Sequence, residues 1–218
     1  MTGELAGNVF LAGVGGQGIL LASEVLCEAF LLSGHDVKKS EVHGMAQRGG
    51  AVTTHLRYGK KVHSPLIEPG KADLLVAFEK MEALRFAHYL KPGGAALVNA
   101  QEILPPSVTM GKEPYPSRIE DRLKEFTPNL FVVDALAAAL SLHEVRAVNI
   151  VMVGAASRFL PLAEDAYIEA LRAALPGKIV EVNVKAFRAG RDLLPAAGTE
   201  TVKPAGGALR RPRMEGNG

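Results

Sequence analysis

Gly13-Val14-Gly15-Gly16-Gln17-Gly18 is the stretch that decides how this chain folds. A short apolar run, Val9-Phe10-Leu11-Ala12, precedes it, and a longer apolar segment at residues 19–32 follows it. Glycines between a buried strand and a helix indicate that a phosphate or another backbone comes close to the main chain there. We therefore expect a strand, a tight turn, a helix over residues 18–33, and a second strand over residues 37–42.

The glycine turn alone admits two interpretations. Gly13, Gly15 and Gly18 fit the three glycines of a dinucleotide-binding fingerprint, and Glu41 lies at about the offset of ~20 residues where such folds carry an acidic ribose ligand. The same glycines also fit a turn that only packs a helix against a sheet. Because the motif says nothing about a base, both interpretations stay open at this point.

Composition excludes several classes of protein. The chain has 218 residues, of which 48% are hydrophobic, so it can bury a sizeable core. Its formal net charge is only +2, and the five Lys/Arg against three acids from Arg191 onward account for all of it. The folded body is therefore neutral, and neither nucleic acid nor an anionic membrane is expected as the main partner.

The cysteine count and the amino terminus limit the compartment and the cofactors. With Cys27 as the single cysteine, the chain forms no internal disulfide and cannot ligate an iron–sulfur cluster or a Cys-rich zinc site. Residues 1–5 lack the form of a signal peptide, and the apolar segment 19–32 is shorter than a membrane span and carries Glu24 and Glu28. These features predict a cytoplasmic protein without a metal site of its own.

The rest of the pattern alternates strands with helices. Strands are expected at 51–58, at 62–64 as its antiparallel partner after a Gly59-Lys60 turn, at 73–78, at 95–99 and at 129–133. Helices are expected at 80–90, 118–126, 135–142 with Asp134 as cap, 149–160, 163–175 and 182–189, with a proline-rich excursion at 104–117.

This alternation predicts an α/β fold. We expect a three-layer single domain over residues 1–190, with a mostly parallel central sheet, flanking helices and an added antiparallel ribbon or sheet. Residues 191–218 are rich in proline, glycine and charge, which predicts a disordered tail.

Four segments together carry a resemblance to a known family. They are the glycine turn through Ile19, Glu41-Val42-His43-Gly44-Met45-Ala46-Gln47-Arg48-Gly49-Gly50, Ser64-Pro65-Leu66-Ile67, and Ala72-Asp73. The chain resembles, over about residues 8–190, the gamma subunit or domain of the 2-oxoacid:ferredoxin oxidoreductases. The segment from His43 to Gly50 most resembles the beta subunit of the indolepyruvate ferredoxin oxidoreductases, whereas relatives acting on other 2-oxoacids more often carry a Tyr-Gly-Pro-Glu type segment there.

The resemblance implies a subunit of an enzyme that converts a 2-oxoacid and coenzyme A to acyl-CoA and CO2 while reducing ferredoxin. This chain lacks the Gly-Asp-Gly and paired Asn residues of a thiamine site and any CxxC set. Thiamine diphosphate, Mg²⁺ and the iron–sulfur clusters are therefore expected on a catalytic partner subunit, and the chain is expected to be inactive alone. No catalytic residue is assigned to it.

The two motifs supply the candidate contacts with ligand or partner. The glycine turn offers main-chain N–H groups to an anion such as a coenzyme A phosphate, or to a partner's backbone. Arg48 offers a fork for carboxylate or phosphate but fits equally a loop-fixing arginine; His43 fits a proton donor or a loop histidine, and Met45 fits interface packing. The full candidate set is Gly13, Gly15, Gly16, Gln17, Gly18, His43, Gly44, Met45, Gln47, Arg48 and Gly49.

Two alternatives remain beside the subunit hypothesis. One is a stand-alone NAD(P)-binding oxidoreductase, with the glycine turn on pyrophosphate and Glu41 on the ribose. The other is a structural subunit that binds no ligand.

Overall fold

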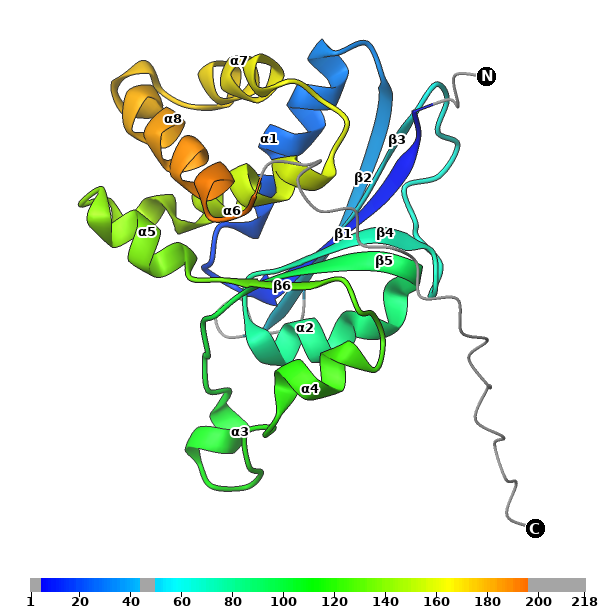
Figure 1. Cartoon of the computed structure of the whole chain (residues 1–218), viewed down its shortest axis with the longest axis vertical. Coiled ribbons are helices and arrows are strands. Elements are labelled where there is room, and N and C mark those ends of the chain that lie inside the picture. The colour runs from blue at the N-terminus through cyan, green and yellow to red at the C-terminus, as the bar shows by residue number, and fades with distance from the viewer. Residues whose placement is uncertain (1–4, 44–49, 196–218) are drawn as a thin grey trace.

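Strand β1 (Gly7–Val14) lies inside a six-stranded sheet of order β2-β3-β1-β4-β5-β6 (Figure 1). The computed structural model describes residues 5–43 and 50–195. The other strands are β2 (Asp36–His43), β3 (Ala51–Gly59), β4 (Ala72–Ala77), β5 (Leu90–Asn99) and β6 (Leu130–Val133). Strands β1, β4, β5 and β6 pair in parallel, and β3 pairs antiparallel with both β1 and β2.

The expected antiparallel addition exists, but its pairing differs from the prediction. We expected residues 62–64 to pair with 51–58; instead β3 inserts between β1 and β2 over its whole length, with Val14 opposite Ala51 and Asp36 opposite Gly59. Both edges of β3 are therefore occupied, and the segment after it runs as a loop whose Val62 N–H is bound by the Asp36 carboxylate (2.7 Å). The 62–64 prediction was wrong because it relied on the local turn at Gly59-Lys60. In the structure β3 instead forms longer ladders with the preceding strand β2 and with the distant strand β1.

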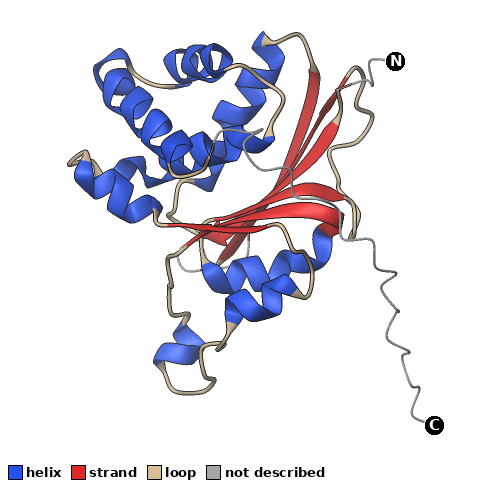
Figure 2. Cartoon of the chain, viewed as in Figure 1, coloured by secondary structure: helices blue, strands red, loops and turns tan. Residues whose placement is uncertain are grey.

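Helices cover both faces of the sheet, which confirms the three-layer α/β arrangement (Figures 1 and 2). Helices α2 and α4 lie on one face, and α1 and α5–α8 on the other. Their bounds are α1 (Ile19–Leu32), α2 (Lys80–Phe86), α3 (Pro106–Thr109), α4 (Ile119–Lys124), α5 (Ala135–Ser141), α6 (Val148–Ala156), α7 (Glu164–Ala174) and α8 (Gly177–Asp192). Three 3₁₀ turns add Ala87–Tyr89, Val145–Ala147 and Ser157–Phe159.

Several element boundaries differ from those expected. The helix expected over 80–90 ends at Phe86, and after one 3₁₀ turn Leu90 already belongs to β5, whose pairing with β4 shifts in register between Ala72 and Leu74. Helix α8 begins at Gly177 rather than at 182, because Pro176 ends the preceding turn and opens the next helix. Helix α8 continues to Asp192. The expected division of the chain into a domain over residues 1–190 and a tail over residues 191–218 stays a prediction.

The core consists of one hydrophobic cluster on each face of the sheet. The larger cluster joins the apolar side of β1 and β4 to α1, α6, α7 and α8, and the smaller one joins the other side of the sheet to α2 and α4. Helix α6 is buried from Asn149 through Ala156, and all of these residues except Asn149 are apolar or glycine, as a helix covered on every side requires. None of the helices in the described part of the chain is long and apolar enough to span a membrane.

Candidate functional site

The structure brings the ends of the two sequence motifs together at the carboxyl edge of the parallel strands. The N–H of Gly15, in the glycine turn, donates to the carbonyl oxygen of Gly50 at 2.9 Å. This contact follows from the sheet order, because the loop joining β2 to β3 opens onto the same edge at which β1 ends. His43 is the last residue of β2, opposite Val52. The other predicted residues of the second motif, Gly44, Met45, Gln47, Arg48 and Gly49, lie outside the described residues.

The backbone of the turn requires glycine at two positions. Gly16 has φ +102° and Gly18, the N-cap of α1, has φ +75°, both in the left-handed region that disfavours side chains. No side chain caps the start of α1, and no acidic residue stands in its first turn. The N–H groups at this helix start are therefore free of a local acidic partner, and the helix dipole favours an anion there.

Gln17 holds the turn together from inside. Its Oε1 accepts from the N–H of Val14 (2.8 Å), and its Nε2 donates to the carbonyl oxygen of Phe78 (2.8 Å) and to Oε1 of Gln101 (3.1 Å). These bonds tie the ends of β1, β4 and β5 to one another. The structure thus gives Gln17, which the sequence placed among the ligand or interface residues, a positioning contact within the chain.

Gly13 and Gly18 allow close packing around the hydrogen bonds of Gln17, which we call the Gln17 clamp. A Cβ on Gly13 would lie 2.7 Å from Oε1 of Gln17 and 2.9 Å from Cβ of Phe78. At Gly18 the same atom would meet Nδ2 of Asn149 at 2.7 Å, and that amide donates to the Gly18 carbonyl oxygen (3.2 Å). Both glycines therefore serve packing, which was one of the two interpretations of the motif.

A cavity of about 430 Å³ opens beside the turn. Gly15, Gly16, Gln17 and Gly18 form one wall, and residues from β5, α5 and α6 or next to them form the rest: Gln101, Ile103, Leu136, Val145, Arg146, Val148 and Asn149. Arg146 is the one formal charge among these lining residues, and Glu144 pairs with it at 3.1 Å. The buried Oδ1 of Asn149 has no hydrogen-bond partner in the described structure.

The sequence alone did not indicate three of the residues that line this cavity. Gln101, Arg146 and Asn149 stand far from the glycine turn in the chain and reach it only through the fold. Of the three, only Asn149 has a sequence feature that could have indicated a role, because it is a lone amide in the apolar run of α6. A buried amide there needs a polar partner, and the Gly18 carbonyl supplies one.

The side chains that were given no chemical role have local explanations. Burial in α1 raises the pKa of the Cys27 thiol to about 12, so the group stays an unreactive thiol. Nδ1 of His55 accepts from the N–H of Ile67 at 3.0 Å, and burial lowers the pKa of this imidazole. Neither residue contributes to the cavity.

Comparison with known proteins agrees with this geometry. A family model described as pyruvate ferredoxin/flavodoxin oxidoreductase matches residues 8–193, which includes both motifs and the cavity. The chain belongs to this family. The indolepyruvate oxidoreductase subunit IorB of Thermococcus kodakarensis is 39% identical over 84% of this chain and 93% of its own length. Its counterpart in Archaeoglobus fulgidus is 40% identical over 84% and 92%.

Solved structures of the pyruvate ferredoxin/flavodoxin oxidoreductase family share the fold. The gamma subunit of a keto/oxoacid ferredoxin oxidoreductase from Geobacter sulfurreducens superposes with a TM-score of 0.65 at 22% identity, covering 86% of this chain and 95% of that one. Pyruvate oxidoreductase subunit PORC from Thermotoga maritima gives 0.65 at 22% identity, covering 87% and 97%. This chain therefore shares its fold with both of these subunits.

The position of Glu41 also argues against a stand-alone dinucleotide-binding enzyme. In a dinucleotide fold the acidic residue ends the strand next to β1. Here β3 separates β2 from β1, and Glu41 lies opposite Thr54, which in turn lies opposite Leu11 in mid-strand. The Glu41 carboxylate is also paired with Lys39 at 2.8 Å. The NAD(P)-binding alternative was therefore wrong.

Proposed function

We propose that this chain is the gamma-type subunit of an indolepyruvate-type 2-oxoacid:ferredoxin oxidoreductase, acting in the cytoplasm. The complex would convert a 2-oxoacid and coenzyme A to acyl-CoA and CO2 and pass the electrons to ferredoxin. The observation that carries the proposal is the joining of the glycine turn to the His43–Gly50 segment through Gly15 and Gly50, within a chain about 40% identical to IorB subunits over 84% of its length.

The catalytic cofactors belong to the partner in this proposal. An iron–sulfur cluster takes thiolate ligands, typically four, whereas the one cysteine of this chain is buried with its pKa raised to about 12. Thiamine diphosphate, when bound with Mg²⁺, supplies the carbanion that decarboxylation of a 2-oxoacid needs. This chain's own residues would orient and cover the partner's site rather than perform that step.

The carboxyl edge of the sheet exposes apolar side chains that a partner subunit could cover. Leu20, Val42 and Val145, at the start of α1, the end of β2 and the cavity wall, are 41%, 53% and 51% exposed. Exposed apolar side chains gathered beside a cavity are typical of an interaction surface. The main-chain N–H groups at the start of α1 and the guanidinium of Arg48 would meet an anionic group there, either of coenzyme A or of the partner subunit.

A reconstitution experiment tests the proposal. The chain purified alone should be colourless and should not reduce a viologen dye with any 2-oxoacid and coenzyme A. Co-expression with its catalytic partner should give a complex that contains iron and thiamine and reduces the dye with indolepyruvate. Turnover by the isolated chain, or a complex that is equally active without this chain, would contradict the proposal.

Arg48→Ala tests the contact itself, with Arg122→Ala on the exposed face of α4 as the matched control. Loss of a charge-assisted contact typically costs about 1.5–3 kcal/mol, or roughly 10- to 100-fold in an equilibrium constant. We expect an unchanged melting temperature for the isolated subunit, together with a raised KM for coenzyme A or weaker subunit association. A variant that melts far below the parent yet turns over normally in the complex would make Arg48 a loop-fixing residue instead.

A further inference from the structure

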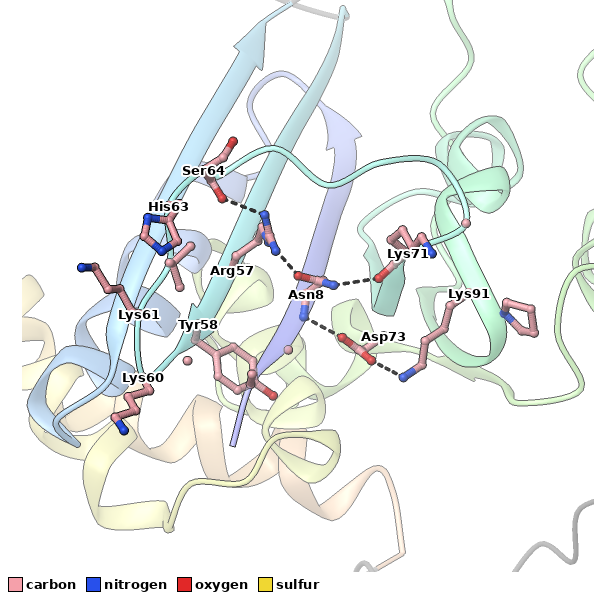
Figure 3. A pocket seen from close by; sticks show the side chains of 16 residues that line it. Asn8, Arg57, Tyr58, Lys60, Lys61, His63, Ser64, Lys71, Asp73 and Lys91 are labelled. Atoms are coloured by element: carbon pink, nitrogen blue, oxygen red, sulfur yellow. Dashed lines mark hydrogen bonds and ion pairs between the residues drawn. The ribbon is translucent and has the colours of Figure 1, made fainter. Parts of the chain in front are cut away.

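A second, larger cavity lies at the opposite edge of the sheet, where the parallel strands begin (Figure 3). It is an open groove of about 910 Å³ between the start of β1, the end of β3, the β3–β4 connection and the start of β5. We call it the basic groove after six of its lining residues, Arg57, Lys60, Lys61, His63, Lys71 and Lys91. Asp73 is the one carboxylate among the lining residues, all of which belong to the described structure.

The floor of the basic groove is a closed hydrogen-bond network. The guanidinium of Arg57 donates to Oδ1 of Asn8 (2.9 Å) and to the carbonyl oxygen of Ser64 (3.0 Å), both neutral acceptors. The N–H of Asn8 donates to Oδ2 of Asp73 (2.7 Å), and the same carboxylate forms an ion pair with Lys91. The one carboxylate is thus neutralised by Lys91, while the half-buried charge of Arg57 faces only uncharged oxygens.

The rim adds further positive charge from two sides. Figure 3 shows Lys60 and Lys61 on one side of Arg57, beside His63, and Lys71 on the other side, beside the Lys91 that pairs with Asp73. Lys61 and Lys71 are exposed, and neither has a carboxylate within ion-pair distance in the described part of the chain. Because the whole chain carries a formal charge of only +2, this concentration of cations is local rather than a general property of the surface.

We propose that the basic groove docks an acidic segment of a protein partner. Its cations are flexible lysine side chains spread over two rims, and the polar groups of its floor are already hydrogen-bonded to one another. Such a surface offers distributed charge instead of the fixed, convergent donors that a small anion needs. Complementary charge of this kind steers two proteins together and fixes how they align at their contact. The proposal is independent of the function of the carboxyl edge.

The chain's own carboxyl-terminal segment does not suit this groove. Residues 196–218 contain Lys203, Arg210, Arg211 and Arg213 against Glu200 and Glu215, so the segment is itself basic. Like charges in apposition oppose docking. The occupant is therefore expected to come from another polypeptide.

The test measures binding of a fluorescently labelled oligoglutamate peptide to the full chain by anisotropy, at several salt concentrations. The double variant Lys61→Glu/Lys71→Glu should weaken binding by about tenfold or more, because it reverses charge on both rims without touching the floor network. Lys112→Glu/Lys178→Glu makes the same change in net charge at exposed sites outside the groove, and it should leave the affinity within about twofold. Binding of the parent should weaken steeply as salt rises, since exposed charges are screened.

Four outcomes would overturn the proposal. Equal weakening by both double variants would mean that only net charge matters. Displacement of the peptide by inorganic tripolyphosphate far below the peptide's own dissociation constant would indicate a small-anion site. Tighter binding of an oligothymidylate than of the peptide would indicate nucleic acid. Dimerisation of the chain that blocks the peptide, seen by light scattering, would assign the groove to a second copy.

Discussion

Gln17 illustrates how a single side chain can make a glycine turn rigid. The glycines supply backbone conformations and close approach, but the amide of Gln17 determines which strands the turn is attached to. It satisfies the N–H of Val14 and the carbonyl of Phe78, two main-chain groups at the ends of different strands. A ligand or partner that meets the turn would therefore meet an ordered surface.

We predict that Gln17→Ala destabilises the isolated chain by about 1–3 kcal/mol, because it removes the acceptor for the N–H of Val14 and leaves the carbonyl of Phe78 only the longer bond from Nδ2 of Asn99 (3.3 Å). Gln101→Ala is the matched comparison: it removes one acceptor at 3.1 Å while Gln17 keeps its main-chain bonds, so its effect should be smaller. Urea unfolding followed by circular dichroism measures both. Equal losses for the two variants would show that the clamp is not centred on Gln17.

Glu82 is a buried acid whose ionised form destabilises the folded state. Its side chain is 2% exposed, and its Oε2 has no hydrogen-bond partner in the described structure. Burial raises its pKa to about 7, although the guanidinium of Arg85 lowers it, and the charge of Glu79 raises it further. The folded state therefore favours the protonated acid, and stability should fall as pH rises from the unfolded pKa near 4.5 towards 7.

Glu82→Gln should remove that pH dependence. Above pH 7 the variant should be more stable than the parent by roughly 3 kcal/mol, since the pKa of Glu82 rises from 4.5 to about 7 and one pKa unit corresponds to about 1.4 kcal/mol, and near pH 4.5 the two should be similar. Thermal unfolding across this pH range is the measurement, with the exposed Glu125→Gln as control. A parent whose stability rises between pH 5 and 7 relative to Glu82→Gln would contradict the assignment.

At the scale of elements, α6 and α8 pack through a pair of glycines. A Cβ on Gly154 would lie 1.9 Å from the carbonyl oxygen of Phe187, and one on Gly190 would lie 1.9 Å from that of Val151. Each glycine thus accommodates the backbone of the other helix. This contact places α6, and with it Asn149, against the glycine turn.

Gly154→Ala should force the two helices apart and destabilise the protein by about 3 kcal/mol or more, because the clash is with backbone and overpacking alone costs about 1–3 kcal/mol. Gly177→Ala, at the start of α8, meets no atom within 4 Å and should be neutral or slightly stabilising. Differential scanning calorimetry compares them. A Gly154→Ala protein that melts like the Gly177→Ala protein would refute the close-packing role.

At the scale of the whole molecule, the two edges of one sheet present different surfaces. The carboxyl edge carries the glycine turn, His43 and Gly50 at the two ends of the second motif, and exposed apolar side chains. The amino edge carries the basic groove. Because both edges border the same rigid sheet, a subunit of this shape can contact two polypeptides at once without deforming.

Removal of residues 196–218 should leave the melting temperature nearly unchanged. The segment has few large apolar side chains and is rich in glycine, alanine and charge, so it can bury too little surface to offset the entropy of ordering. The comparison is between the full chain and a chain ending at Pro195, at the same protein concentration. A loss of several degrees would show that the segment packs against the domain.

The sequence by itself determined the layers, most of the elements and the family. Periodicity and turn residues are local, so the βα alternation, the glycine turn and the Asp134 cap, which accepts from the N–H of Ala137 at 2.8 Å, were all predictable. The two motifs in register pointed to the gamma-type subunits. The apolar sequence context of Cys27 also agrees with its burial in α1.

Only the tertiary structure decided strand order and the two cavities. β3 could pair with residues 62–64 or insert between β1 and β2. The outcome depends on competition between a short ribbon and two long ladders, one with the preceding strand β2 and one with the distant strand β1, and no local sequence pattern measures that competition. The walls of both cavities, from Asn149 beside Gly18 to Lys71 across from Lys61, join residues remote in the chain. Packing of whole elements brings such residues together, so the chemistry of each edge follows from the fold.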